Sequence, residues 1–375
     1  MKIAFVYDVI YPYVKGGVEK RIHELATRLS ARGHDVHIIG MKYWEGADSQ
    51  KKDGVTLHGV FPSRELYADG RRTIREAIYF SSRLIPFLMR EKFDIIDCQQ
   101  FPYFPCFSVK LVSVLKKMPF VITWHEVWGD YWYEYLGWKG VFGKTTEGLV
   151  SGLTPNISAV SGITAVNLRR LGVCSEIAVF PNGIDTVRVR TLSPAPHSSD
   201  IIFVGRLMKE KHVDVLVQAF ATLLPEKPGL TLVILGEGPE REAIRFLIRD
   251  RGIVDRVLLK PFVDTHDEVI SLMKSSHVCV IPSTREGFGI AALEALACGL
   301  PVVTVDHPDN AIRDLISEET GFLSSLTVED LAGNIRCALS RYPAMKTACI
   351  RSAEFYDWDT VVIRLERYYQ SVLSP

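Results

Sequence analysis

Two glutamates flank a glycine-containing turn in the segment Pro282–Glu294, with Glu286 in the turn and Glu294 inside the helix-forming run that follows. The first turn of a helix has free backbone N–H groups and a partial positive charge that attract phosphate, and glycines such as Gly287 and Gly289 let a ligand approach the main chain. Carboxylates accept hydrogen bonds from hydroxyl groups. Phosphate combined with several hydroxyls is the chemistry of a nucleotide-sugar, although an ordinary strand-to-helix turn with solvated glutamates gives the same pattern.

A pair of cations follows another apolar run. Arg206 comes directly after Ile201–Gly205, and Lys211 precedes the next helical pattern. Two cations at that place can neutralise a diphosphate, whereas a solvated loop is the alternative interpretation. The apolar run Val257–Leu259 ends shortly before Phe262, where the backbone can face a nucleotide base.

Glycine turns follow two more apolar runs. The loop Tyr11–Glu19 contains Gly16 and Gly17 and opens a helical pattern, so its N–H groups can approach a phosphate. A plain glycine turn is the alternative. The loop lacks the GxGxxG spacing of nicotinamide-binding proteins, and the chain has no GxxxxGK[ST] sequence of a P-loop ATPase. A second tight turn, Gly236–Pro239, includes Gly238.

A histidine follows the apolar run Phe120–Trp124. A lone histidine is often structural, but at the carboxyl end of a parallel strand His125 would face a ligand. It belongs to an aromatic block, which comprises Trp124, Trp128, Tyr131, Trp132, Tyr133, Tyr135 and Trp138. This block is consistent with packing under a loop, a platform for stacking sugars, or a belt near lipid headgroups.

A basic helical pattern covers 71–90. Its arginines Arg72, Arg83 and Arg90 fall on one face, while apolar residues fall on the other. Such a helix can lie on an anionic membrane, but a solvated basic face is the more common case, and Pro86 interrupts this one.

The organisation of the chain predicts an α/β protein. Apolar, β-branched runs alternate with helical patterns, which indicates βαβ units and parallel sheets. The pattern restarts after a stretch rich in proline and serine, so we expect two doubly wound, Rossmann-like domains that face each other across a cleft. Their predicted bounds are 1–185, completed by a C-terminal helix at about 356–375, then a linker at 186–199, and a second domain at 200–355.

The bulk composition excludes several classes of protein. The chain has 44 Lys plus Arg and 44 Asp plus Glu, so no overall charge favours nucleic acid. Seven scattered cysteines without a CxxC pair predict neither a zinc site nor a disulfide framework, which is typical of a reducing cytoplasm. The apolar run near Met1 is too short for a signal peptide, and no run is long enough for a membrane span.

Together these segments resemble the retaining glycosyltransferases of group 1 (family 4), which have the GT-B fold. The resemblance extends over nearly the whole chain and combines motifs that are individually weak. They are Gly16-Gly17-Val18-Glu19, Ser158-Ala159-Val160-Ser161, Pro181-Asn182-Gly183-Ile184-Asp185, Val204-Gly205-Arg206-Leu207 with Lys211, Gly236-Glu237-Gly238-Pro239, and Glu286-Gly287-Phe288-Gly289 through Glu294.

The resemblance implies roles for individual residues. Glu286 would hold hydroxyls of the donor sugar, Glu294 the ribose, and His125 would lie beside the transferred sugar. The implied catalytic groups are Glu286, His125, Arg206 and Lys211, and the implied donor contacts are Gly16, Gly17, Gly205, Arg206, Lys211, Gly238, Phe262, Glu286, Gly287, Phe288, Gly289 and Glu294. The family generally needs no metal or other cofactor. Its donors are nucleotide-sugars, here UDP- or GDP-linked, and the departing phosphate takes the acceptor's proton in a front-face reaction.

The sequence departs from the family's pattern at two places. His212 stands where the family usually has glycine, and Val305–Asn310 replaces a glycine-rich run, which leaves the roles of Asp306 and Asn310 open. The resemblance implies a glycan or a lipid-linked molecule as the acceptor, and the aromatic block and basic helix favour one at the inner face of a membrane, in peripheral contact with it. Two alternatives stay open: a sugar-nucleotide epimerase of the same architecture, and a sugar-binding protein without catalysis.

Overall fold

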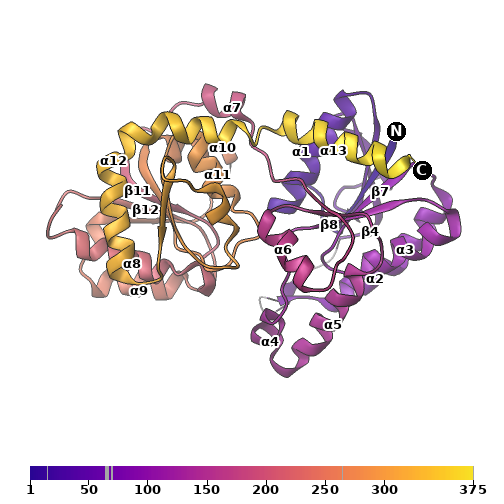
Figure 1. Ribbon diagram of the computed structural model, residues 1–375, viewed down its shortest axis with the longest axis horizontal. Helices are drawn as coiled ribbons and strands as arrows, with labels where there is room; N and C mark the ends of the chain where they lie inside the picture. The colour runs from indigo at the N-terminus through magenta and orange to yellow at the C-terminus, as the bar shows by residue number, and fades with distance from the viewer. Residues whose placement is uncertain (15, 64–66, 69–70, 264, 375) are drawn as a thin grey trace. The chain divides into compact units, whose positions relative to one another are not determined.

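The computed structural model describes residues 1–14, 16–63, 67–68, 71–263 and 265–374. The chain forms two compact α/β units (Figure 1). The first comprises Met1–Asn182 together with Trp358–Pro375, and the second comprises Gly183–Asp357. Each unit is built on a parallel sheet, as the alternation of apolar runs and helical patterns predicts.

The first unit contains an eight-stranded sheet in the order β10-β9-β8-β7-β1-β2-β4-β3, which is parallel except for the β3–β4 pair. Helices on both faces cover its central strands, so β1, β7 and β8 are buried at every position except Lys2 and are mostly apolar. Its strands are β1 (Lys2–Val6), β2 (Asp35–Lys42), β3 (Ser49–Lys52), β4 (Val55–Pro62), β7 (Ile95–Gln99), β8 (Phe120–Trp124), β9 (Ile157–Ala159) and β10 (Ile177–Val179).

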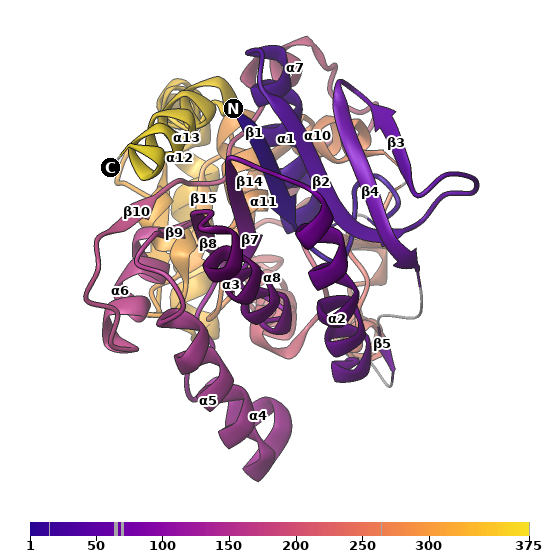
Figure 2. The same ribbon diagram turned by 90° about the vertical axis from the view of Figure 1, so that its right-hand side faces the viewer.

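The helices of the first unit include one from the far end of the chain. Helix α13 (Trp358–Leu373) contacts α1 (Gly17–Ala31) and buries Tyr369 in the core of this unit. The remaining helices are α2 (Ile74–Arg90), α3 (Phe104–Lys116), α4 (Tyr131–Leu136), the 3₁₀ turn η1 (Gly137–Lys139), α5 (Gly140–Ser151) and α6 (Gly162–Arg170). Helices α4 and α5 project away from the sheet of this unit (Figure 2).

The second unit contains a six-stranded parallel sheet in the order β13-β12-β11-β14-β15-β16. The chain reverses direction across the sheet between β11 and β14, and ligands of doubly wound sheets bind at such a switch point. The strands are β11 (Ser199–Val204), β12 (Leu232–Leu235), β13 (Val257–Lys260), β14 (Ser276–Ile281), β15 (Val302–Val305) and β16 (Gly321–Ser324). The helices are α7 (Thr186–Thr191), η2 (Lys209–Lys211), α8 (Val213–Leu223), α9 (Arg241–Asp250), η3 (Val254–Arg256), α10 (His266–Lys274), α11 (Ile290–Ala297), η4 (Ala311–Leu315) and α12 (Val328–Glu354).

Two expectations from the sequence require correction. Residues 186–199 are not a separate linker, because they lie in the second unit and begin with helix α7. The side chain of Asp185 caps this helix by accepting a hydrogen bond from the Arg188 backbone N–H at 2.8 Å. An aspartate at this place is a sequence signal for the start of a helix, but the proline and serine residues that follow it led to the prediction of a linker. The basic helix begins at Ile74, and Arg72 lies in the short strand β6 (Arg71–Arg72), so Arg72 is not on its face.

Candidate functional site

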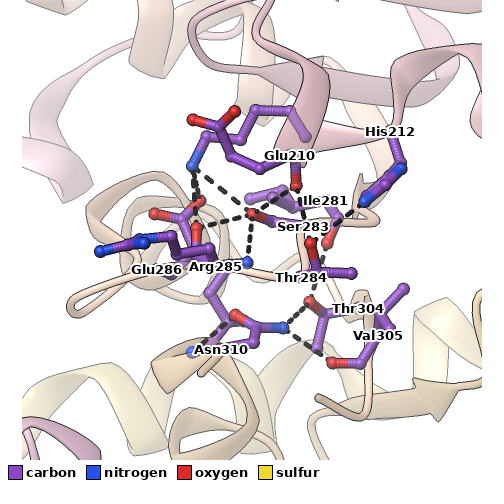
Figure 3. A network of polar contacts seen from close by, with 12 residues as sticks. Glu210, His212, Ile281, Ser283, Thr284, Arg285, Glu286, Thr304, Val305 and Asn310 are labelled. Atoms are coloured by element: carbon purple, nitrogen blue, oxygen red, sulfur yellow. Dashed lines mark hydrogen bonds and ion pairs between the residues drawn. The ribbon is translucent and has the colours of Figure 1, made fainter. Parts of the chain in front are cut away.

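Three loops of the second unit meet beyond the carboxyl ends of β11, β14 and β15 (Figure 3). Backbone hydrogen bonds join the loop after β14 to both neighbours. The Thr284 N–H donates to the Glu210 carbonyl at 3.0 Å, and the Glu286 N–H donates to the Asp309 carbonyl at 3.0 Å. The Ala311 N–H completes this bridge by donating to the Glu286 carbonyl at 3.0 Å. The backbone of the β14 loop is therefore fixed at the switch point of the sheet.

Lys211 and Glu286 form an ion pair at this point. Lys211 Nζ lies 2.7 Å from Glu286 Oε1, and the two side chains are only 12% and 20% exposed. The same ammonium group donates to the Arg285 carbonyl at 3.3 Å and approaches Ser283 Oγ at 3.5 Å. Such a cation is held in place before any ligand arrives, and it provides positive charge without needing to reorganise. Two residues that the sequence singled out separately are thus brought into contact.

Asn310 fixes the loop after β15, which pairs with the backbone at Glu286, and the sequence left this role open. Its Nδ2 donates to Thr304 Oγ1 at 2.9 Å and to the Val305 carbonyl at 2.8 Å, and its Oδ1 accepts from the Ile312 N–H at 3.2 Å. The residue is fully buried. It therefore fixes the loop whose backbone pairs with Glu286, whereas Asp306 makes an ion pair with Arg313 at 3.0 Å.

His212 occupies the position where the sequence departs from the glycine pattern. It adopts a left-handed backbone conformation with φ +47°, which is the conformation that glycine normally supplies. Its Nε2 lies 3.1 Å from Thr284 Oγ1, so the side chain contributes a contact to the loop after β14.

Glycine is required at two of the turns for packing within the unit. Gly289 precedes α11 with φ +91°, and a Cβ there would lie 2.3 Å from Ile312 Cγ1. Within the described residues no side chain caps α11, so its first turn keeps N–H groups that can face an anion. A Cβ at Gly238 would lie 2.3 Å from the Leu207 carbonyl oxygen, so this glycine permits a close approach of the chain to itself.

The other predicted donor contacts of the second unit differ in accessibility. Gly205 directly follows β11 and donates its N–H to the Leu235 carbonyl at 3.1 Å, and the exposed Arg206 comes next. Phe262 is half-exposed after β13. Phe288, in contrast, is buried with its ring 6.0 Å from that of Tyr356, so only its backbone is available to a ligand.

Glu294 is buried rather than on the surface. Its side chain is 6% exposed, and its Oε1 lies 3.1 Å from Nε2 of His266, at the start of α10. Burial, followed by the charge of Glu294, raises the pKa of Cys298 to about 12. The sequence did not identify His266, although Thr265 before it caps α10 through a 3.3 Å bond from the Glu268 N–H. In the part of the chain that the structure describes, no third histidine, cysteine or acidic side chain joins a metal-binding group here.

In the first unit, His125 lies directly after β8, as expected. Its Nε2 is 2.8 Å from Gln99 Oε1, and its backbone N–H donates to Gln100 Oε1 at 3.0 Å. Burial, with a smaller contribution from the Arg21 cation, lowers the pKa of His125 to about 3. The imidazole is therefore neutral near pH 7 and acts through hydrogen bonds rather than as a cation.

The glycine loop of the first unit is exposed, and residue 15 within it lies outside the described residues. Gly16 caps α1 with an extended backbone, and Gly17 is the first residue of that helix. The Glu19 carboxylate lies at this helix end, with Oε2 2.5 Å from the place of a Cβ on Gly16. The negative charge of Glu19 in the first turn stabilises the positive end of α1, so a phosphate at Gly16 would meet that charge.

The aromatic block divides into a packed part and an exposed part. Trp124 is fully buried, and the rings of Trp128 and Trp132 lie 4.5 Å apart. Tyr133 and Trp138 instead point outward, and Trp138 is 74% exposed. Packing under a loop therefore accounts for the first group only. None of the helices in the described residues has both the length and the apolarity needed to cross a bilayer.

Two family models match the chain in succession. The model described as Glycosyltransferase Family 4 matches residues 15–188, and the model described as Glycosyl transferases group 1 matches residues 192–354. The first match lies mainly in the first unit and the second match lies in the second unit, the two parts in which the βα pattern repeats.

Relatives and solved structures that align with nearly the whole chain include glycosyltransferases as well. Glycogen synthase of Mycobacterium tuberculosis is 25% identical over 98% of this chain and 94% of its own length. A phosphatidylinositol N-acetylglucosaminyltransferase component of Arabidopsis thaliana is 24% identical over the full chain and 83% of its own length. The crystal structure of Anabaena HepE in complex with UDP and glucose has a TM-score of 0.75 at 17% identity, covering 99% of this chain and all of that one.

Proposed function

The chain belongs to the group 1 glycosyltransferases with the GT-B fold, and from this premise we propose that it transfers a sugar from a UDP- or GDP-linked donor to a hydroxyl of a glycan or lipid-linked acceptor. We further propose that the transfer retains anomeric configuration and needs no metal ion. The observation that carries this proposal is the Lys211–Glu286 pair at the switch point of the second sheet. It combines a fixed cation for a diphosphate with a carboxylate for sugar hydroxyls.

The charged donor-binding residues of the second unit each have a proposed task. Lys211 and Arg206 neutralise the diphosphate, and the uncapped first turn of α11 adds N–H groups. Glu286 accepts hydrogen bonds from the transferred sugar. Glu294 accepts them from the ribose, and His266 orients its carboxylate.

The proposed chemical step needs little from protein side chains beyond charge and position. The acceptor oxygen forms a bond to the anomeric carbon on the face from which the phosphate leaves. The bond from that carbon to the phosphate oxygen breaks, and the acceptor's proton passes to the departing diphosphate. Lys211 stabilises the negative charge that grows on that diphosphate, which is the largest contribution that a fixed cation makes to such a reaction.

Relatives support a carbohydrate or lipid-linked acceptor. One relative is named a glycogen synthase and another a component of a phosphatidylinositol N-acetylglucosaminyltransferase. We propose that this chain acts in the cytoplasm, at the inner face of a membrane.

The test of this function starts from binding. We expect UDP- or GDP-sugars to raise the melting temperature, because a ligand at about 100 times its Kd stabilises the native state by about 2.7 kcal/mol. Incubation of the stabilising donor with glycan and lipid-linked acceptors, followed by NMR of the product, should show a new glycosidic bond with the donor's anomeric configuration. Formation of an epimer without acceptor would instead establish the epimerase alternative. Stabilisation by free monosaccharides but not by nucleotides would establish the sugar-binding protein.

Glu294→Ala should weaken nucleotide binding selectively. The variant loses hydrogen bonds to a carboxylate, each worth about 1.5–3 kcal/mol, so we expect donor affinity to fall about 10- to 100-fold. Glu242→Ala is the matched control, because Glu242 is an exposed glutamate on α9 of the same unit. Calorimetric titration of both variants with nucleoside diphosphate measures the difference. Equal affinities would remove Glu294 from the ribose site.

A surface of the first unit supports the proposed membrane contact. Trp138 and Phe142, at the junction of η1 and α5, are 74% and 68% exposed. Other exposed aliphatic or methionine side chains on α2, α3 and α5 are Ile74, Ile78, Met89, Leu111, Val114, Leu115, Val141 and Leu149. The exposed arginines of α2 are Arg75, Arg83 and Arg90. Exposed apolar side chains and arginines on the same helix, as on α2, suit the interface of a membrane with anionic headgroups.

Phe142→Asp should weaken binding to such membranes. Burying a phenylalanine contributes about 1.5–3 kcal/mol, so we expect the partition coefficient to fall at least about tenfold. Co-sedimentation with phosphatidylcholine vesicles, with and without phosphatidylglycerol, measures it. Phe246→Asp is the control, since Phe246 is 71% exposed on α9 of the other unit. Equal sedimentation of the two variants would contradict this surface.

A further inference from the structure

A buried carboxylate lies beneath the carboxyl ends of β7 and β8. The Asp97 side chain accepts three hydrogen bonds from side chains: from Thr123 Oγ1 at 2.6 Å, from Tyr369 OH at 2.5 Å and from Gln99 Nε2 at 3.0 Å. The strands align these groups, because Gln99 pairs with Thr123 in register and Tyr369 reaches them from α13. The carboxylate is almost completely buried.

This environment determines which way the Gln99 amide points. Burial raises the pKa of Asp97, while the bonds from Thr123 and Tyr369 and the charge of Arg21 favour its ionised form. The amide of Gln99 directs its NH₂ toward Asp97, because Nε2 donates to Asp97 Oδ1 at 3.0 Å and an amide nitrogen can only donate. Its oxygen, Oε1, then faces the imidazole of His125 at 2.8 Å.

The amide orientation in turn selects the tautomer of His125. An amide oxygen accepts but does not donate, so the ring nitrogen that faces it, Nε2, must carry the proton. The imidazole is neutral because burial lowers its pKa to about 3, so Nδ1 carries a lone pair. Among the described residues, none forms a hydrogen bond with Nδ1.

We propose that Gln99 is a positioning residue that holds His125 in the Nε2–H tautomer and thereby presents Nδ1 as an acceptor to a hydroxyl of a bound sugar. The assignment of the sugar rests on the proposed function, whereas the assignment of the tautomer does not. A neutral acceptor fits a substrate whose hydroxyl groups are its hydrogen-bond donors. It also excludes His125 as a proton donor at Nδ1, which separates its role from that of the cation Lys211.

Nitrogen NMR of the protein labelled in its histidine rings tests the tautomer directly, in the absence of any substrate. We expect the wild-type His125 signals to show a protonated Nε2 and an unprotonated Nδ1. Gln99→Met keeps the length of the side chain but removes the acceptor, so the signals should shift toward the mixture of tautomers seen in free histidine. Gln100→Met is the matched control, because Gln100 bonds to the backbone N–H of His125 and to the Glu126 carbonyl but not to the imidazole, so the tautomer should stay unchanged.

A wild-type signal with protonated Nδ1, or a tautomer unaffected in a folded Gln99→Met variant, would overturn the positioning role. The wild-type spectrum decides the tautomer even where the variant does not fold. A transfer assay supplies the second readout: we expect kcat to fall about tenfold in Gln99→Met while KM for the donor changes less than about twofold. Unchanged kcat with a shifted tautomer would overturn the role of Nδ1 at the sugar, and loss of all transfer in the wild type would instead reject the proposed function.

Discussion

Lys211→Ala is expected to lower kcat/KM for sugar transfer by about 10²–10³-fold, the loss typical of removing one fixed group that stabilises charge in a transition state. The ammonium group lies 2.7 Å from Glu286 and is only 12% exposed, so water replaces it poorly. The other lysine of this 3₁₀ turn, Lys209, is exposed to solvent, so it does not substitute for the mostly buried ammonium group of Lys211. Steady-state kinetics with varied donor at a saturating acceptor concentration measure the loss.

Lys209→Ala provides the control and should change kcat/KM by less than about twofold, as expected of a solvated side chain. Glu286→Ala should cause a loss comparable to that of Lys211→Ala. Because the two side chains are in contact, the double variant should lose less than the product of the single losses. Near-normal turnover in Lys211→Ala or Glu286→Ala, with the fold intact, would contradict the proposed site.

Asp97→Ala is expected to destabilise the first unit by about 3–5 kcal/mol, because removing one partner of a buried charged network leaves the others uncompensated. Tyr369 OH and Thr123 Oγ1 lose their bonds to the carboxylate, and the buried guanidinium of Arg21 loses its counter-charge. Hydrogen exchange should show faster exchange in β7 and β8, with little change in β11 and β14, which belong to the other unit.

Asp130→Ala is the control for this substitution. Asp130 pairs with Lys144 at 2.6 Å but is exposed, and such ion pairs contribute about 1 kcal/mol or less. Exchange rates in β7 should therefore stay close to those of the wild type. A similarly small effect of Asp97→Ala would show that the network contributes little to stability.

The sequence predicted those parts of the fold and site that depend on local pattern. Parallel strands end at one edge of a sheet, so the residues after each apolar run were expected to lie together, and Lys211 and Glu286 do. The predicted C-terminal helix is also present, and it packs in the first unit.

The supporting residues could not be predicted because their partners are distant in sequence. Asp97 meets Tyr369 only after α13 has packed onto the first unit. Asn310 supports Glu286 because the backbones of their two loops pair with each other. The partner of Glu294 is His266, which lies on the preceding helix, α10. The aromatic block is a related case, since its composition does not distinguish the packed Trp132 from the exposed Trp138.

The packing of α13 into the first unit also has a consequence for biosynthesis. The second unit is continuous, Gly183–Asp357, whereas the first unit needs residues that the ribosome adds only after the second is complete. Domains generally fold in the order of synthesis, but here the order should be reversed: the second unit can close while Asp97 still lacks Tyr369. A nascent chain stalled before Trp358 should therefore contain a protease-resistant second unit attached to an N-terminal segment that proteases and chaperones still recognise.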